Sequence, residues 1–129
     1  MQDSGTTSSA ENVHLSVPLP GERGSAVLAH MSSFLGYAIP LGQFLGPYTV
    51  ELACAAESAF VRSHTREALN FQLTILAILF AGLLLWPLGI GPVVLALALL
   101  HSVIQTVRGA RAASESRRFR YPLTIRLLE

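Results

Sequence analysis

The longest apolar region of the chain follows directly on a mixed polar segment. Residues 58–72 carry two arginines, a histidine and a glutamate, and the next charged residue after them is Arg108. The turn-forming run WPLGIGP divides the apolar region, which predicts two helices at 59–86 and 93–108. A short connection makes such helices antiparallel neighbours. We therefore predict a regular transmembrane hairpin.

An earlier apolar block, residues 26–56, cannot form one continuous helix. Its middle contains Gly36, Pro40, Gly42, Gly46 and Pro47. Proline removes a backbone hydrogen bond and clashes with the preceding turn, so we expect two short helices, at 26–39 and 47–57. Fourteen helical residues cover about 21 Å, whereas the hydrocarbon core of a bilayer is about 30 Å thick. This broken hairpin is expected either to span with help from its turn or to form a shallow, re-entrant hairpin.

The composition supports a membrane protein and argues against a nucleic-acid partner. The chain has 129 residues, of which 51% are hydrophobic and 13% are charged, whereas soluble domains are about 25% charged. The net charge of +1 lacks the basic excess of nucleic-acid-binding proteins. Residues 1–24 are rich in Ser, Thr, Gly and Pro and are expected to be a disordered tail without a secretory signal. The predicted fold is therefore all-α, a small integral membrane bundle of four segments at 25–128 with an interfacial C-terminal tail.

Arginine positions predict the orientation in the membrane. Arginines flank the apolar helices, and the two apolar turns carry no charge. Positive flanks face the cytoplasm, so both termini and the middle connection are expected on the cytoplasmic side of a multi-pass inner-membrane protein. The tail at 108–120 is expected to form an interfacial helix on anionic lipid, followed by an extended strip against residues 58–66. The expected interfacial, lipid-contacting residues are Arg62, Arg66, Arg108, Arg111, Arg117, Arg118, Arg120 and Arg126.

Polar side chains recur on one face of the third predicted helix. Glu67, Asn70 and Thr74, followed by Ala77 and Ala81, are spaced by three or four residues and share a face. This face is expected either to pack and hydrogen-bond against another helix or to form a polar groove for a ligand, ion or peptide.

On the last predicted helix, Gln105 is expected to bond Thr74 or Asn70, and His101 is the deepest ionisable residue of the hairpin. His101 is either a hydrogen-bonded structural residue or a group that handles protons or ions. The complete candidate polar face in the membrane is Glu51, Glu67, Asn70, Thr74, His101 and Gln105.

Glu51 and the single cysteine are the remaining candidates for a chemical role. Glu51 is expected to pair with Arg62 or Arg66 or to extend to the interface, and His30 near Glu51 is a further possibility. One cysteine, Cys54, excludes an internal disulfide and a cysteine-based zinc site. No catalytic motif is present and the four histidines lack metal spacing, so we predict neither an enzyme nor a cofactor.

Three stretches resemble a known family. HMSSFLGYAIPLGQFLGPYTVEL (30–52), SAFVRSHTREALNFQLT (58–74) and RYPLTIRLL (120–128) are similar to a widespread bacterial family of small membrane proteins of unknown function. That family is grouped with the Tic-twenty component of the chloroplast inner-envelope import machinery. The resemblance implies a four-helix membrane domain and a role near protein translocation, which is an analogy at the level of the fold.

Three classes of function remain open. The first is a non-catalytic interaction or assembly module that binds a membrane-protein partner or forms a homo-oligomer, in translocation or envelope maintenance. The second is a small oligomeric channel or carrier, and a sensor of envelope stress is a third. A conduit needs polar residues across the bilayer, and residues 83–97 supply none. This favours the interaction module unless the first hairpin supplies the outer path through Gln43 and Tyr48. The contact surface of the module would be the broken hairpin and the polar face of the third helix.

Overall fold

The computed structural model describes residues 17–128, and the described chain is helical, as the sequence predicted. No strand occurs within 17–128. The expected tail lies outside the described residues as far as position 16, and the first described helix already begins at Pro20. The elements are α2 (Pro20–Met31), the 3₁₀ turn η1 (Ser32–Tyr37), α3 (Gly42–Cys54), α4 (Ala59–Leu84), the 3₁₀ turn η2 (Trp86–Leu88) and α5 (Gly91–Ser114).

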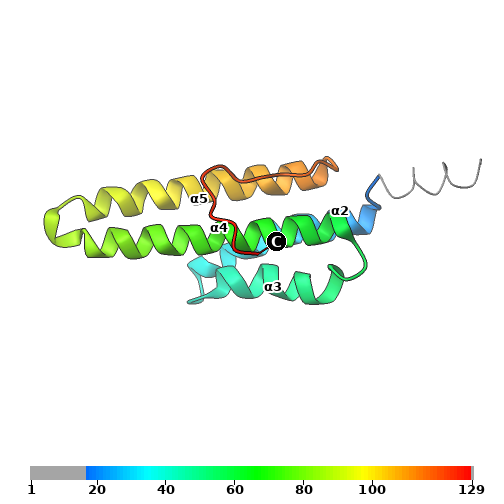
Figure 1. Ribbon diagram of the computed structural model, residues 1–129, viewed down its shortest axis with the longest axis horizontal. Helices are drawn as coiled ribbons and strands as arrows, with labels where there is room; N and C mark the ends of the chain where they lie inside the picture. Colours follow the sequence, from blue (N-terminus) through cyan, green and yellow to red (C-terminus); the bar gives the residue numbers. More distant parts are fainter. Residues whose placement is uncertain (1–16, 129) are drawn as a thin grey trace, which may run out of the picture.

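The two long helices, α4 and α5, form the expected antiparallel hairpin (Figure 1). Ser58 caps α4, because its hydroxyl accepts the Val61 N–H at 3.2 Å. Both helices are long and apolar enough to cross a membrane. Helix α5 continues to Ser114, which is beyond its expected end at Arg108. The separate interfacial helix expected at 108–120 is therefore wrong, because these residues first extend α5.

The short hairpin has different boundaries from those expected. Helix α2 ends at Met31 and continues as η1, and α3 already begins at Gly42. The chain reverses at Leu41, whose φ of 64° is in the left-handed region. Pro47 was expected to start the second helix, but it lies inside α3 and is buried. A proline there removes one backbone hydrogen bond, and the helix tolerates that loss.

The short hairpin covers only the half of the α4–α5 hairpin that lies away from the η2 turn (Figure 1). At its tip, η1 and Gln43 lie beside Gln72, Ile75 and Leu79 of α4. The two arms pack closely, because a Cβ added at Gly46 would lie 2.4 Å from Cβ of Ser32. Four helices therefore pack together at one end of the molecule, and two continue alone toward the other.

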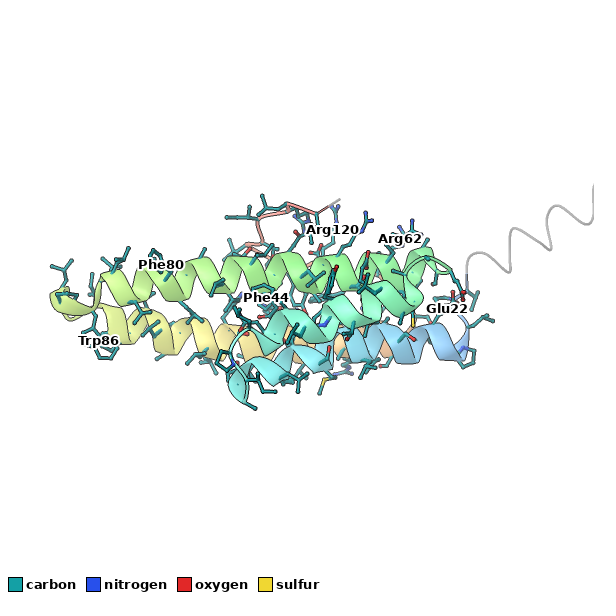
Figure 2. The ribbon with its side chains drawn as sticks, turned by 90° about the horizontal axis from the view of Figure 1, so that it is seen from below. Glu22, Phe44, Arg62, Phe80, Trp86 and Arg120 are labelled. Carbon is teal, nitrogen blue, oxygen red and sulfur yellow. The ribbon has the colours of Figure 1, made fainter. Side chains whose placement is uncertain are left out.

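Residues 117–128, the C-terminal strap, fold back over the helices. The chain turns at Ser116, which has a φ of 59°, and the strap lies on the face of the α4–α5 pair away from α2 (Figures 1 and 2). An extended C-terminal strip was expected against residues 58–66. The strap instead lies along residues 67–74 of α4, because the polar side chains there bind its backbone.

Candidate functional site

The polar face of α4 holds the first part of the strap through a carboxylate. Glu67, which is buried, accepts the Tyr121 N–H at 2.7 Å. The same oxygen of Glu67 accepts a hydrogen bond from the Arg126 guanidinium at 3.0 Å. A buried carboxylate needs such partners, because an unpaired buried charge is costly. Glu67 thus uses its charge to bind the chain's own strap.

Asn70 and Thr74 hold the end of the strap. The Asn70 carbonyl oxygen accepts the N–H groups of Leu127 at 3.0 Å and Leu128 at 2.9 Å. Its amide nitrogen donates to the Leu128 carbonyl at 2.8 Å. Thr74 accepts the Ile125 N–H at 3.0 Å. The strap has no strand partner, so these side chains satisfy backbone groups that would otherwise lack a hydrogen bond.

Beneath the strap lies a chain of buried hydrogen bonds that connects three distant parts of the sequence. The Tyr121 hydroxyl lies 2.7 Å from His30 Nδ1, and His30 Nε2 lies 2.8 Å from His64 Nδ1. His64 Nε2 lies 3.1 Å from the Arg117 carbonyl oxygen. We refer to His30, His64 and Tyr121 as the histidine–tyrosine cluster.

The last acceptor fixes the direction of every bond in the cluster. A carbonyl only accepts, so His64 donates from Nε2 to Arg117. If His64 is neutral, its Nδ1 accepts from His30 Nε2, and His30 Nδ1 accepts from the Tyr121 hydroxyl. The strap is thereby tied at two points, as a donor through Tyr121 and as an acceptor through the carbonyl of Arg117.

Burial keeps the cluster uncharged at neutral pH. Burial, with a smaller contribution from the neighbouring His64 imidazole, lowers the pKa of His30 from its ordinary value of 6.5 to about 3. Burial also raises the pKa of the Tyr121 hydroxyl well above its usual range. A neutral His30 and a protonated Tyr121 are the forms that the directed hydrogen bonds require.

Gly109 of α5 makes room for the cluster. A Cβ added at this position would lie 2.7 Å from the Tyr121 hydroxyl oxygen and 2.9 Å from His30 Nδ1. Tyr121 reaches His30 between α4 and α5 at this point. A side chain on residue 109 would therefore displace the bond that ties the strap to α2.

The expected pairing of Glu51 is confirmed, with Arg66 as its partner. Glu51 Oε1 lies 3.3 Å from Arg66 Nε, and Thr65 donates a hydrogen bond to the same carboxylate. Arg62 donates instead to the Ala55 carbonyl at 3.0 Å, in the connection between α3 and α4. His30 is occupied within the cluster and does not pair with Glu51.

With this geometry established, a comparison with known families identifies the chain. The magnetosome magnetite crystal formation protein family, MamF/MmsF, matches residues 21–128. The chain belongs to this family. The resemblance to a Tic-twenty-like family is therefore wrong, and its implied link to protein translocation has no support. No curated protein and no solved structure matches the chain.

The family is associated with the magnetosome membrane, and its matched region contains all the residues described above. The match begins within α2 and ends at Leu128, the last described residue of the strap. It also covers both helices that are long enough to cross a membrane. The strap and the histidine–tyrosine cluster thus lie within the MamF/MmsF region.

Gln105 of this MamF/MmsF chain does not make the expected hydrogen bond. Gln105 was expected to bond Thr74 or Asn70, but the strap occupies both of them, and no partner for Gln105 Oε1 exists within the described residues. His101 packs against Phe71, with ring centroids 5.9 Å apart. The expected bond is absent because backbone groups of the strap already occupy the side chains of Asn70 and Thr74.

The predicted stripe on α4 therefore divides into two parts. Its polar members Glu67, Asn70 and Thr74 are buried, whereas Ala77 and Ala81 are exposed. Helix α5 approaches α4 at Gly82, where an added Cβ would lie 2.8 Å from the Leu95 side chain. The close contact between α4 and α5 thus uses Gly82, which was not among the small residues expected there.

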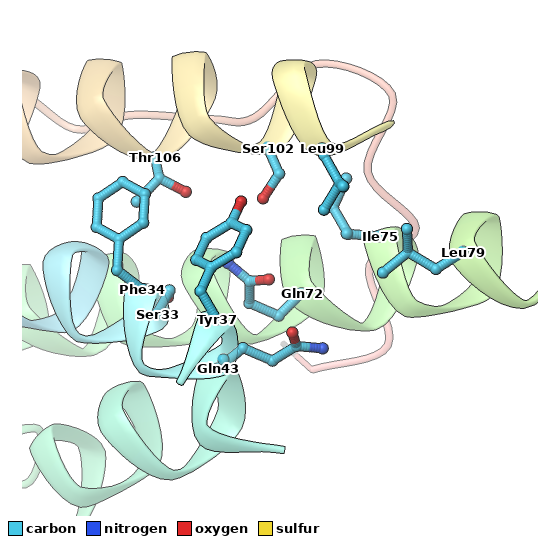
Figure 3. Close-up of a pocket in the computed structure, with 11 residues that line it drawn as sticks. Ser33, Phe34, Tyr37, Gln43, Gln72, Ile75, Leu79, Leu99, Ser102 and Thr106 are labelled. Atoms are coloured by element: carbon cyan, nitrogen blue, oxygen red, sulfur yellow. The ribbon is translucent and has the colours of Figure 1, made fainter. Parts of the chain in front are cut away.

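A small polar cavity lies between η1, α4 and α5 (Figure 3). Its volume is about 90 Å³, and Gln72, Ser102 and Thr106 contribute polar groups to its wall. The hydroxyl of Ser33, which also lines it, has no partner within the described residues. A cavity of this size and polarity has room for water. The opposite wall is apolar, with Ile75, Leu79 and Leu99.

No group of three His, Cys, Asp or Glu side chains with metal-binding geometry occurs within 17–128. The candidate site of this MamF/MmsF chain is the set of buried hydrogen bonds that joins α2, α4 and the strap. Sequence reasoning missed His30, His64, Tyr121 and Gly109 as its members. The signal was present, because the three motif stretches each contain one member of the histidine–tyrosine cluster.

Proposed function

We propose that this MamF/MmsF chain is a non-catalytic integral protein of the magnetosome membrane that acts in magnetite crystal formation by associating with other membrane proteins or with copies of itself. One observation carries the proposal. The polar side chains of α4 bind the chain's own strap, so the surface that remains for other molecules is mostly apolar. Such a surface suits lipid and membrane-protein contact.

In the proposed arrangement the bilayer lies along the α4–α5 hairpin, and the exposed apolar side chains there support this. Trp86 lies twenty positions after Arg66, which corresponds to about 30 Å of helix and matches the thickness of the hydrocarbon core. Phe80, Leu83 and Leu84 are exposed in this interval. Arg62 and Glu22 lie at the opposite end of the molecule from Trp86 (Figure 2). The arginine-rich end is the cytoplasmic side in this arrangement, with both termini on it.

In this placement the short hairpin is re-entrant. Its tip lies beside Gln72, Ile75 and Leu79, which is about half of the distance from Arg66 to Trp86 along α4. The non-helical turn at 38–41 would then lie at the depth of the lipid chains, partly covered by protein. Of the two arrangements open from the sequence, the re-entrant one fits these contacts.

The contact surface of the module is the outer face of the short hairpin. The polar face of α4, the other surface considered from the sequence, is occupied by the strap. Helices α2 and α3 and the turn between them expose a row of large apolar side chains. These are Leu28, Met31, Leu35, Tyr37, Ile39, Leu41, Leu45, Tyr48 and Leu52.

A channel or carrier is the alternative, and the cavity in Figure 3 is the feature that favours it. From Leu76 to Leu100, however, the indole N–H of Trp86 is the only polar side-chain group. A single chain therefore supplies no polar path across the outer half of the bilayer. Proteoliposome flux assays test this alternative, and pH-dependent flux that His101→Leu abolishes would support it.

Site-specific photo-crosslinking tests the proposed module directly. A photoreactive amino acid at Tyr48 should give a discrete protein adduct in native membranes, whereas one at Phe80 should crosslink mainly to lipid. Both side chains are large, aromatic and exposed. Equal lipid crosslinking at the two positions would contradict the proposed contact surface. In magnetosome-forming cells, Tyr48→Glu should then change the crystal size distribution seen by electron microscopy.

A further inference from the structure

We propose that four arginines between α4 and the strap bind the phosphate group of an anionic lipid. Arg66 from α4 and Arg118, Arg120 and Arg126 from the strap line a pocket of about 600 Å³, which we call the basic pocket. The inference rests on the proposed membrane placement and adds a ligand class to it. Arginine suits this ligand, because its planar fork donates two hydrogen bonds to a phosphate.

The charges within the basic pocket do not balance. Glu51 pairs with Arg66, and Glu67 pairs with Arg126. Within residues 17–128, Arg118 and Arg120 form no ion pair, and both side chains are exposed. Four guanidinium groups thus face two carboxylates, and Glu67 also accepts the Tyr121 N–H. Counted over residues 17–128, the pocket has an excess of positive charge, which lies at the level of the cytoplasmic lipid headgroups in the proposed placement.

A separate apolar groove lies farther along α4 than the basic pocket and favours a lipid over free phosphate. The groove lies between α4 and α5 and has a volume of about 260 Å³. Phe71, Ile78 and Leu97 line it, and Leu123 of the strap closes one side. The basic pocket uses α4 residues 63–70 and the groove uses 71–78. Positive charge followed by apolar surface toward the bilayer centre is the order of a phospholipid headgroup and its acyl chain.

The test compares two variants with the same change of net charge. Arg118→Gln/Arg120→Gln alters the basic pocket, and Arg108→Gln/Arg111→Gln alters exposed arginines of α5 outside it. The full chain is reconstituted in phosphatidylcholine nanodiscs that contain traces of spin-labelled phosphatidylglycerol or spin-labelled phosphatidylcholine. Electron paramagnetic resonance then gives the protein-bound fraction of each label.

The unaltered chain should prefer phosphatidylglycerol, and each pocket arginine should contribute a factor of about five. The pocket variant should lose most of this preference and the α5 variant should keep it. Equal losses in both variants would overturn the proposal in favour of general surface charge. Release of the label by millimolar inorganic phosphate at constant ionic strength would overturn it in favour of free phosphate.

The proposed function has a separate readout in the same samples. Resistance to alkaline extraction and flotation with liposomes report membrane integration, whichever lipid is bound. A chain that is integrated and shows no lipid preference contradicts the basic pocket alone. A chain that does not integrate contradicts the proposed function. The thermal transition of each variant confirms that it is folded, as expected for exposed arginines outside the cluster.

Discussion

The two halves of α4 lie in the same helix and serve different purposes. The first half buries His64, Glu67 and Asn70 among three helices and the strap. The second half exposes Phe80, Leu83 and other apolar residues, and the short hairpin reaches along it as far as Leu79. The inner half is therefore a polar, densely connected core, whereas the outer half is an apolar hairpin with little protein around it.

This difference shows how a short chain can hold polar groups close to a bilayer. Every polar group on the buried face of α4 needs a partner where water is scarce. The strap brings backbone N–H groups to this face, and α2 brings His30. The outer half needs no such partners, because its helical backbone is satisfied internally and its side chains suit lipid.

Two phenylalanines on α4 give the largest expected difference between the halves. Phe71 is 1% exposed and stacks on Tyr121 with ring centroids 4.1 Å apart, whereas Phe80 is 63% exposed. Phe71→Ala should lower the free energy of unfolding by about 4 kcal/mol. Phe80→Ala should change it by less than about 0.5 kcal/mol, because lipid replaces the lost contacts. Reversible denaturation in mixed micelles measures both, and similar losses would refute the division of α4.

Removing the middle of the histidine–tyrosine cluster should have the next largest effect. His64→Leu leaves the Arg117 carbonyl and the His30 N–H without their partners. Two buried unsatisfied groups should cost about 3 kcal/mol in the free energy of unfolding. His101→Leu is the matched control, and it should cost less than about 1 kcal/mol, because His101 is only partly buried and leucine keeps an apolar contact with Phe71. A neutral result for His64→Leu in the same denaturation assay would exclude the directed chain of bonds.

A methyl group added at Gly109 should weaken the contact between Tyr121 of the strap and His30 of α2. Gly109→Ala places a Cβ 2.7 Å from the Tyr121 hydroxyl oxygen, and this overpacking should cost about 2 kcal/mol. Limited proteolysis should then cleave the strap faster than in the unaltered chain. Gly24→Ala is the control, since an added Cβ there meets nothing within 4 Å. Unchanged strap cleavage in Gly109→Ala would show that Tyr121 does not depend on this gap.

Acidification should weaken the inner half gradually. His30 has a pKa of about 3 in the folded chain and 6.5 ordinarily, so between these values the unfolded state binds more protons. Stability is therefore complete above pH 6.5 and decreases as the pH falls toward 3, by up to about 1.4 kcal/mol per pH unit.

The titratable side chains that face His30 are His64 and Tyr121. Protonation of His30 Nδ1 would remove the hydrogen bond that it accepts from the Tyr121 hydroxyl. Denaturation at several pH values should show a weaker slope in His30→Asn. A slope that His30→Asn leaves unchanged would assign the pH dependence to other groups.

Much of the helical framework could be predicted, because apolar runs and glycine–proline breaks are local signals. The span of α4 follows closely from such signals. The reversal at Leu41 could not be predicted, since a left-handed leucine has no sequence signature. The C-terminal boundary of α2 and the N-terminal boundary of α3 depend on that reversal, and the prediction misplaced both for this reason.

The candidate site was predicted only on one side. The spacing of Glu67, Asn70 and Thr74 identified a polar face, because helical periodicity is visible in the sequence. Its partner was missed, because the strap binds through backbone N–H groups, which every residue except proline carries. The bond between His30 and Tyr121 joins residues 91 positions apart, and no local pattern reports such a contact.

Residue-resolved hydrogen exchange is the most direct test of whether polar side chains of α4 bind the backbone of the strap. In detergent micelles, the amides of Tyr121, Ile125, Leu127 and Leu128 should exchange slowly, because side chains of α4 accept their hydrogen bonds. The amide of Leu123, whose side chain is 87% exposed, should exchange fast and serve as an internal control. Asn70→Ala should accelerate Leu127 and Leu128 most. If the four bonded amides exchanged as fast as that of Leu123 while α4 stayed protected, the binding of the strap by α4 would be contradicted.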